Sequence, residues 1–175
     1  MRTTRPSRAA REHKGHAPKQ VRCALLTVSD SRTPATDETG NLLRRELERG
    51  GHRVVDRRVV RDEVRRIRSA MRRARAPPVR AEVLLINGGT GIAKRDVTVE
   101  AVRPMLDKEL PGFGELFRRL SYEEIGSPAW LSRSLAGTHK GMLVVCLPGS
   151  PQAVRLALRK LLLPELGHAI GLLRR

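Results

Sequence analysis

The chain has 175 residues, of which 39% are apolar and only 2% are aromatic. That length suits one domain that can bury a core without metals or disulfides. Lys and Arg number 35 against 18 Asp and Glu, a formal net charge of +17, which predicts attraction to nucleic acid, anionic surfaces or phosphorylated small molecules. The arginines carry no interleaved aromatic residues, which argues against the stacking platforms that bind single-stranded nucleic acid.

Residues 1–20 are basic and have almost nothing apolar to bury, so they are predicted to be a disordered tail in front of one domain over residues 21–175. No stretch is long and apolar enough to cross a membrane, and no secretory segment opens the chain. Cys23 and Cys146 both sit in apolar runs, which favours buried reduced thiols. We therefore expect a soluble, cytoplasmic protein with no membrane partner.

Residues 21–28 (VRCALLTV) form a nearly continuous apolar run, typical of a strand covered on both faces of a parallel sheet. Ser29, Asp30 and Arg32 follow the strand directly. Ligands of open α/β sheets bind beyond the carboxyl ends of strands, so these residues are candidates for a site. The alternative is that they only cap and turn the chain. A helix is expected from Asp37 to the Gly50-Gly51 stop.

A second strand is expected over residues 54–60, followed by a helix over residues 64–75 with an apolar stripe at spacings of three and four. Asp62 lies between them. It is either the N-cap of that helix or a site residue, because it also falls where a strand ends.

A third strand at residues 81–87 runs into Gly88-Gly89-Thr90-Gly91, with Lys94, Arg95 and Asp96 close behind. Three glycines in four residues free the backbone N–H groups to point at one anionic group. The cations then suit phosphate charge and the carboxylate suits a metal ion. A tight turn between strand and helix is the alternative for this glycine-rich segment. The loop has neither the dinucleotide-binding spacing nor the P-loop ending.

The remaining pattern predicts a helix over residues 98–107 that Pro104 kinks or divides, a turn at residues 111–115 and a helix over residues 115–125. A last strand at residues 141–147 precedes a turn at residues 148–151, a helix over residues 152–163 and a tail interrupted by Pro164 and Gly167. Strands and helices alternate throughout. The predicted fold is a single three-layer, doubly wound α/β domain with a mostly parallel sheet.

Five ordered blocks resemble the MoaB/MogA family of molybdenum cofactor biosynthesis. They are TVSDSR at 27–32, GGTGIAKRDVTVEAV at 88–102, PGFGELFR at 111–118, SYEEIGSPAWLSR at 121–133 and LPGSP at 147–151. The third to fifth blocks lean toward the MoaB branch. The resemblance implies a doubly wound α/β fold, a homo-trimer or homo-hexamer, and adenylyl transfer from ATP to the terminal phosphate of molybdopterin. A MoeA-type molybdate-inserting protein is the partner it suggests.

By the same resemblance, the acidic pair of the family falls on Asp62 and Asp96, which are the predicted catalytic residues and Mg²⁺ ligands. Together with the candidates at the strand ends, the predicted molybdopterin- and nucleotide-binding residues are Ser29, Asp30, Arg32, Gly88, Gly89, Thr90, Gly91, Arg95, Ser132, Arg133, Pro148, Gly149 and Ser150.

Attack of a phosphate oxygen on the α-phosphorus of ATP needs alignment and charge shielding more than a strong base. The sequence meets that need with two aspartates that could bind Mg²⁺. The charge of the departing pyrophosphate could be neutralised by Lys94, Arg95 or Arg32. Two other functions stay open: a molybdopterin-binding oligomer or carrier without catalysis, and nucleic-acid binding driven by charge. The last ranks lowest because no recognition motif accompanies the charge.

Overall fold

The computed structural model describes residues 17–175; residues 1–16 of the predicted basic tail lie outside the described residues. Six strands form one sheet in the order β2-β1-β3-β6-β5-β4. The strands span Arg22–Val28 (β1), Arg53–Val60 (β2), Val83–Asn87 (β3), Lys108–Glu109 (β4), Leu135–His139 (β5) and Met142–Leu147 (β6). The four strands from β2 to β6 are parallel, whereas β5 and β4 pair antiparallel. The predicted mostly parallel sheet is confirmed.

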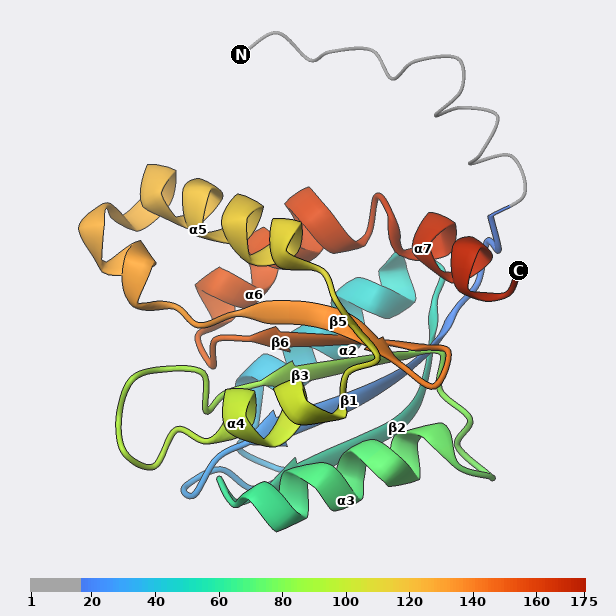
Figure 1. The fold of residues 1–175 in the computed structure, drawn as a ribbon, viewed down its shortest axis with the longest axis horizontal. Helices are drawn as coiled ribbons and strands as arrows, with labels where there is room; N and C mark the ends of the chain where they lie inside the picture. Colours follow the sequence, from blue (N-terminus) through green and yellow to red (C-terminus); the bar gives the residue numbers. More distant parts are fainter. Residues whose placement is uncertain (1–16) are drawn as a thin grey trace, which may run out of the picture.

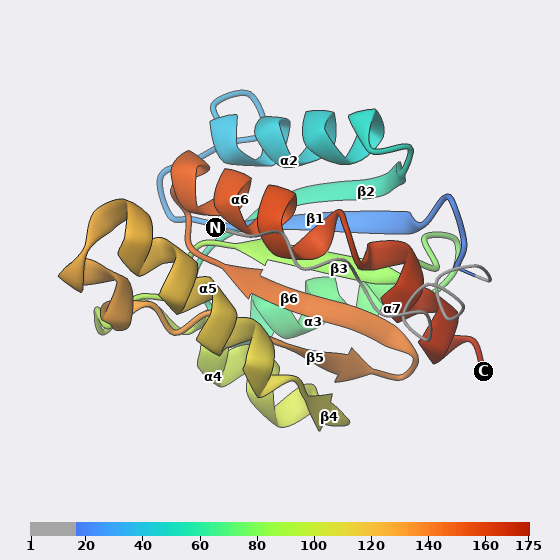
Figure 2. The same cartoon turned by 90° about the horizontal axis from the view of Figure 1, so that it is seen from above.

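Helices cover both faces of the sheet (Figures 1 and 2). They span Glu38–Arg49 (α2), Val64–Arg75 (α3), Thr98–Val102 (α4), Pro111–Ile125 (α5), Pro151–Ala157 (α6) and Leu166–Leu173 (α7). Figure 1 places α5, α6 and α7 above the sheet and α3 and α4 below it. Two 3₁₀ helices occupy Arg103–Met105 and Ser127–Leu131, and a π-helical turn at Leu158–Leu162 extends α6.

Alternation along the strands divides the core into two layers. On β1, Leu25 faces the cluster under α2, α6 and α7, while its neighbour Leu26 faces the cluster over α3 and α4. Leu85 and Ile86 divide in the same way on β3. Side chains that are buried on both faces explain why these strands read as continuous apolar runs, and the predicted three-layer architecture is confirmed.

Both cysteines are free and buried, as predicted, and burial raises the pKa of each thiol to about 12. The predicted division of the helix after residue 98 is also confirmed, because α4 ends before Pro104 and a 3₁₀ turn takes over. Within residues 17–175, no helix has the length and apolar character needed to cross a membrane.

The structure corrects three parts of the prediction: one helix start, two missed strands and the C-terminal tail. Helix α5 starts at Pro111 and not at residue 115, because proline is well suited to the first turn of a helix and the two glycines continue it. Strands β4 and β5 were missed, since β4 has two residues and β5 contains Gly137. The expected tail after Pro164 is helix α7, which buries Leu166 and Ile170 in the core.

Candidate functional site

The loop after β3 is closed around the buried side chain of Thr98. The Thr98 hydroxyl donates to the carbonyl oxygen of Gly88 at 2.9 Å, and its backbone N–H donates to that of Gly89 at 3.0 Å. Gly88 and Gly89 have φ angles of 98° and 63°. A Cβ at Gly88 would lie 2.2 Å from the Val28 carbonyl oxygen. Glycine is therefore required here both by the backbone conformation and by the lack of space.

Asp62 lies against this loop. A Cβ at Gly89 would lie 2.5 Å from Asp62 Oδ2, and Asp62 Oδ1 accepts a hydrogen bond from the Val97 N–H at 3.1 Å. The N-cap of α3 is Glu63, so the alternative role of Asp62 as that cap is wrong. Its carboxylate instead accepts a hydrogen bond from the loop that follows β3.

Three aspartates from three loops converge on this place. The Asp62 N–H donates to Asp30 Oδ1 at 3.2 Å. Burial raises the pKa of Asp62, and the negative charges of Asp96 and Asp30 raise it further, against the Val97 hydrogen bond and the charge of Arg95. A bound cation would reduce the repulsion between these neighbouring carboxylates and so favour the ionised form of Asp62.

Asp96 closes the far end of the same loop. Its Oδ2 accepts a hydrogen bond from the Ala93 N–H at 3.0 Å, and a Cβ at Gly91 would lie 2.7 Å from that oxygen. Lys94 and Arg95 lie between Ala93 and Asp96 and are exposed. The loop thus presents one carboxylate and two cations, as the sequence predicts.

The loop after β1 is held by Ser29, whose Oγ accepts from the backbone N–H groups of Ser31 and Arg32 at 3.3 and 3.2 Å. Arg32 directs its guanidinium to the Thr36 carbonyl oxygen at 3.0 Å. Ser29 therefore shapes the turn, and Asp30 is the residue of this loop that reaches the carboxylate group around Asp62.

Arg133 fastens the glycine loop from the other side. Its Nε donates to the Gly91 carbonyl oxygen at 2.8 Å, and an Nη donates to that of Asp96 at 2.9 Å. The guanidinium also pairs with Glu100, and this hydrogen bond lowers the pKa of the Glu100 carboxyl. The Arg133 N–H donates to the Thr90 carbonyl oxygen at 3.3 Å. These bonds engage Arg133 in holding the loop.

The turn after β6 meets the glycine loop directly. A Cβ at Gly149 would lie 3.5 Å from the Gly88 Cα, and the Gly149 carbonyl oxygen accepts from the Thr39 hydroxyl at 2.9 Å. Ser150 caps α6 by accepting from the Ala153 N–H, and Pro148 precedes it in the same turn. The predicted residues at the ends of β1, β3 and β6 are thus brought to one end of the sheet.

A buried polar network behind the loops was not predicted. Asp37 is only 1% exposed, and its Oδ2 lies 2.8 Å from the Thr27 hydroxyl and 2.9 Å from an Nη of Arg57. The Thr27 hydroxyl also lies 3.0 Å from Asn87 Oδ1. This network joins the ends of β1 and β3, which carry the two loops of the site.

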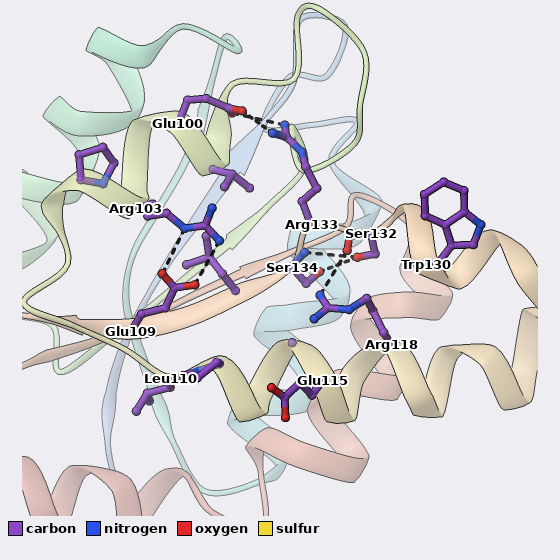
Figure 3. A pocket seen from close by; sticks show the side chains of 15 residues that line it. Glu100, Arg103, Glu109, Leu110, Glu115, Arg118, Trp130, Ser132, Arg133 and Ser134 are labelled. Carbon is purple, nitrogen blue, oxygen red and sulfur yellow. Dashed lines mark hydrogen bonds and ion pairs between the residues drawn. The ribbon is translucent and has the colours of Figure 1, made fainter.

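A pocket of about 480 Å³ opens beside this site and was also missed (Figure 3). Ser132 and Arg133 belong to both. The other charged and aromatic residues that line it are Glu100, Arg103, Glu109, Glu115, Arg118 and Trp130. Its volume falls within the range of small-molecule sites. The PGFGELFR block contains Glu115 and Arg118, so this block was the part of the sequence from which the pocket could have been predicted.

Fold and site define a doubly wound α/β protein with a glycine-rich loop and an acidic group at the carboxyl ends of its parallel strands. Residues 24–168 match the family described as "Probable molybdopterin binding domain". The molybdenum cofactor biosynthesis protein B of Bacillus cereus is 53% identical over 158 residues, which cover 90% of this chain and 93% of that protein.

Solved structures agree. A crystal structure of molybdenum cofactor biosynthesis protein B matches with a TM-score of 0.87 and 51% identity over 91% of this chain and 99% of the other. The tungsten cofactor synthesizing protein MoaB from Pyrococcus furiosus matches with a TM-score of 0.81 and 35% identity over 91% and 100% of the two chains. This chain belongs to the molybdopterin-binding-domain family, and within it the chain is MoaB-like.

Proposed function

We propose that this chain is a molybdopterin adenylyltransferase, which transfers AMP from Mg-ATP to the terminal phosphate of molybdopterin. The observation that carries the proposal is that both aspartates lie against one glycine loop: a Cβ at Gly89 would lie 2.5 Å from Asp62 Oδ2, and a Cβ at Gly91 would lie 2.7 Å from Asp96 Oδ2. Neighbouring carboxylates at a phosphate-sized loop suit a reaction between two phosphorylated molecules.

The acidic group fits Mg²⁺ as a metal shared with a substrate. Among residues 17–175 there is no cluster of three or more His, Cys, Asp or Glu side chains arranged to hold a metal by itself. Mg²⁺ is usually bound through one or two carboxylates, with phosphate oxygens and water completing its shell. Asp62 and Asp96 would hold the ion, which would shield the charge of the triphosphate.

In the proposed reaction, an oxygen of the molybdopterin phosphate bonds to the α-phosphorus of ATP while the bond from that phosphorus to the β-phosphate oxygen breaks. Pyrophosphate leaves with the bonding electrons, and no redox step or base is needed. The backbone of residues 88–91 would hold one anionic group in place. Lys94 and Arg95, exposed on the adjoining loop, would neutralise charge on the leaving pyrophosphate.

The test is incubation of the purified protein with molybdopterin, Mg²⁺ and ATP, followed by mass detection of the AMP adduct and of pyrophosphate. We expect both products, and we expect EDTA and the Asp96→Asn variant to abolish them. Asp107→Asn is the matched control, because Asp107 lies outside the site and accepts a hydrogen bond from the Lys140 N–H at 2.5 Å. Tight molybdopterin binding without adduct would instead support the non-catalytic carrier.

We also propose a homo-oligomer. Of the eight large exposed apolar side chains in the described residues, four lie on and beside α5 without lining the pocket: Leu116, Tyr122, Ile125 and Leu131. Such a gathering is typical of a protein-protein contact. Light scattering should give three or six copies, and Ile125→Glu should lower that number.

A further inference from the structure

The pocket beside the glycine loop contains three carboxylates and three guanidinium groups, and most of them are paired with one another. Arg103 holds Glu109 through two hydrogen bonds, both of 3.1 Å. Arg133 pairs with Glu100 and with the loop. These four side chains build the wall of the pocket and are already satisfied.

Glu115 is different. Its side chain is exposed, lines the pocket from α5 and makes no hydrogen bond or ion pair with any residue that the structure describes (Figure 3). Arg118 is one turn along the same helix, a spacing at which Glu and Arg commonly pair. The Arg118 guanidinium instead lies over Gly114, where a Cβ would meet it at 3.0 Å, and donates to the Ser132 carbonyl oxygen at 3.4 Å. The pocket therefore offers one free carboxylate.

A free carboxylate at a pocket selects ligands by their donor groups, because an ionised carboxylate only accepts hydrogen bonds and has two parallel oxygens. A 2-amino-4-oxopyrimidine ring presents a ring N–H and an adjacent amino group side by side, which matches those oxygens. Adenine presents an amino group beside a ring acceptor, which would repel one of them. The carboxylate thus favours a pterin or guanine edge over an adenine edge.

The pocket also borders the site proposed for adenylyl transfer. The Arg133 N–H donates to the Thr90 carbonyl oxygen, so the segment carrying Ser132 and Arg133 lies between the pocket and the glycine loop. A ligand with its ring in the pocket would have its phosphate directed past this segment toward Gly91, whose carbonyl oxygen accepts from Arg133 Nε.

We propose that Glu115 is a specificity-determining residue that accepts two hydrogen bonds from the 2-amino-4-oxopyrimidine edge of the pterin, with the ring seated in this pocket. The inference rests on the proposed function for the identity of the ligand. It adds which part of the molecule enters which part of the protein, and which side chain recognises it.

The test compares two stable probes by titration calorimetry: 6-hydroxymethylpterin phosphate and 6-hydroxymethyllumazine phosphate, in which oxygen replaces the 2-amino group. The full-length protein should bind the pterin roughly 10- to 100-fold tighter, because the lumazine leaves one carboxylate oxygen unpaired against an opposing carbonyl. In Glu115→Gln this preference should fall below about 3-fold. Glu123→Gln, an exposed position on the same helix, should retain the preference in full.

Guanosine monophosphate is the third probe, since guanine carries the same edge. Tighter Glu115-dependent binding of this nucleotide than of the pterin would overturn the assignment, and so would an unchanged preference in Glu115→Gln. Protein that adenylylates molybdopterin but shows no preference for the pterin contradicts this inference and leaves the proposed function standing. Protein that shows the Glu115-dependent preference but transfers no AMP supports this inference and contradicts the transferase.

Discussion

Asp62 Oδ1 accepts a hydrogen bond from the backbone N–H of Val97 at 3.1 Å, across 35 positions of the chain. This bond fastens the loop that carries Asp96 to the loop between β2 and α3. The carboxylate that is proposed to help bind Mg²⁺ therefore also positions its partner. Variants at Asp62 must be chosen so that the first role is lost and the second is kept.

Asp62→Asn meets that requirement, because an amide oxygen can still accept from Val97. We expect the rate of AMP transfer to fall about 10²- to 10³-fold, the cost typical of removing one electrostatic group from such a site. The variant should melt no earlier than the wild-type protein at neutral pH.

The pH dependence of its stability follows from the raised pKa of Asp62. A carboxyl whose pKa is higher in the folded protein stabilises the fold while it is protonated, and that contribution is lost as pH rises through the raised value. Asp62→Asn should therefore match or exceed the stability of the wild type above that pH, and lose any advantage toward pH about 4, the ordinary carboxyl range. Urea unfolding at several pH values measures this, and a variant clearly weaker at pH 7 would contradict it.

Gly89→Ala should be more damaging than its size suggests. Its φ of 63° is unfavourable for alanine, and the new Cβ would lie 2.3 Å from Thr98 Oγ1 and 2.5 Å from Asp62 Oδ2. We expect a loss of about 2 to 4 kcal/mol in the free energy of unfolding, together with loss of transfer. Gly51→Ala is the control: its φ is 82°, but nothing lies within 4 Å, so only the backbone cost of roughly 1 kcal/mol should remain. Equal losses in the two variants would show that crowding at Gly89 does not matter.

Arg133→Lys tests the fastening of the glycine loop. Lysine keeps the charge but cannot reproduce the guanidinium geometry that reaches Gly91, Asp96 and Glu100 together. We expect faster amide hydrogen exchange across residues 91–97 and a stability loss of about 1 to 2 kcal/mol. Arg119→Lys, whose partner Glu123 is 3.9 Å away on an exposed face, should change neither quantity.

Asp37→Ala removes the centre of the buried network and the N-cap of α2 at once, since Asp37 Oδ1 accepts from the Gly40 N–H at 2.8 Å. Arg57 would lose a partner in a position that is only 21% exposed. We expect a loss of about 3 to 5 kcal/mol by chemical denaturation, which Arg57→Met should partly restore in the double variant. Asp56→Ala, which breaks ion pairs whose arginine partners are 42% and 47% exposed, should cost only about 1 kcal/mol, because the two arginines can turn to solvent. Full additivity of the Asp37 and Arg57 changes would argue against the network.

The sequence by itself determined the parts of the fold that depend on local patterns. The apolar runs of β1 and β3 predict strands because both of their faces are buried, and Gly88 and Gly89 mark a loop because their positive φ angles favour glycine. Five matching blocks were sufficient to indicate the family. Local patterns also misled at Pro111, where a turn-forming residue begins a helix.

Tertiary structure alone decided how the site is assembled. Asp30, Asp62 and Asp96 are far apart in the chain and meet only because β1 and β2, like β1 and β3, pair in parallel, which brings their carboxyl ends to one edge. The hydrogen bonds from Arg133 to the glycine loop likewise form only in the folded protein. The free carboxylate of Glu115 also depends on tertiary structure. The sequence cannot show whether Glu115 has a partner until the positions of all its neighbours are known.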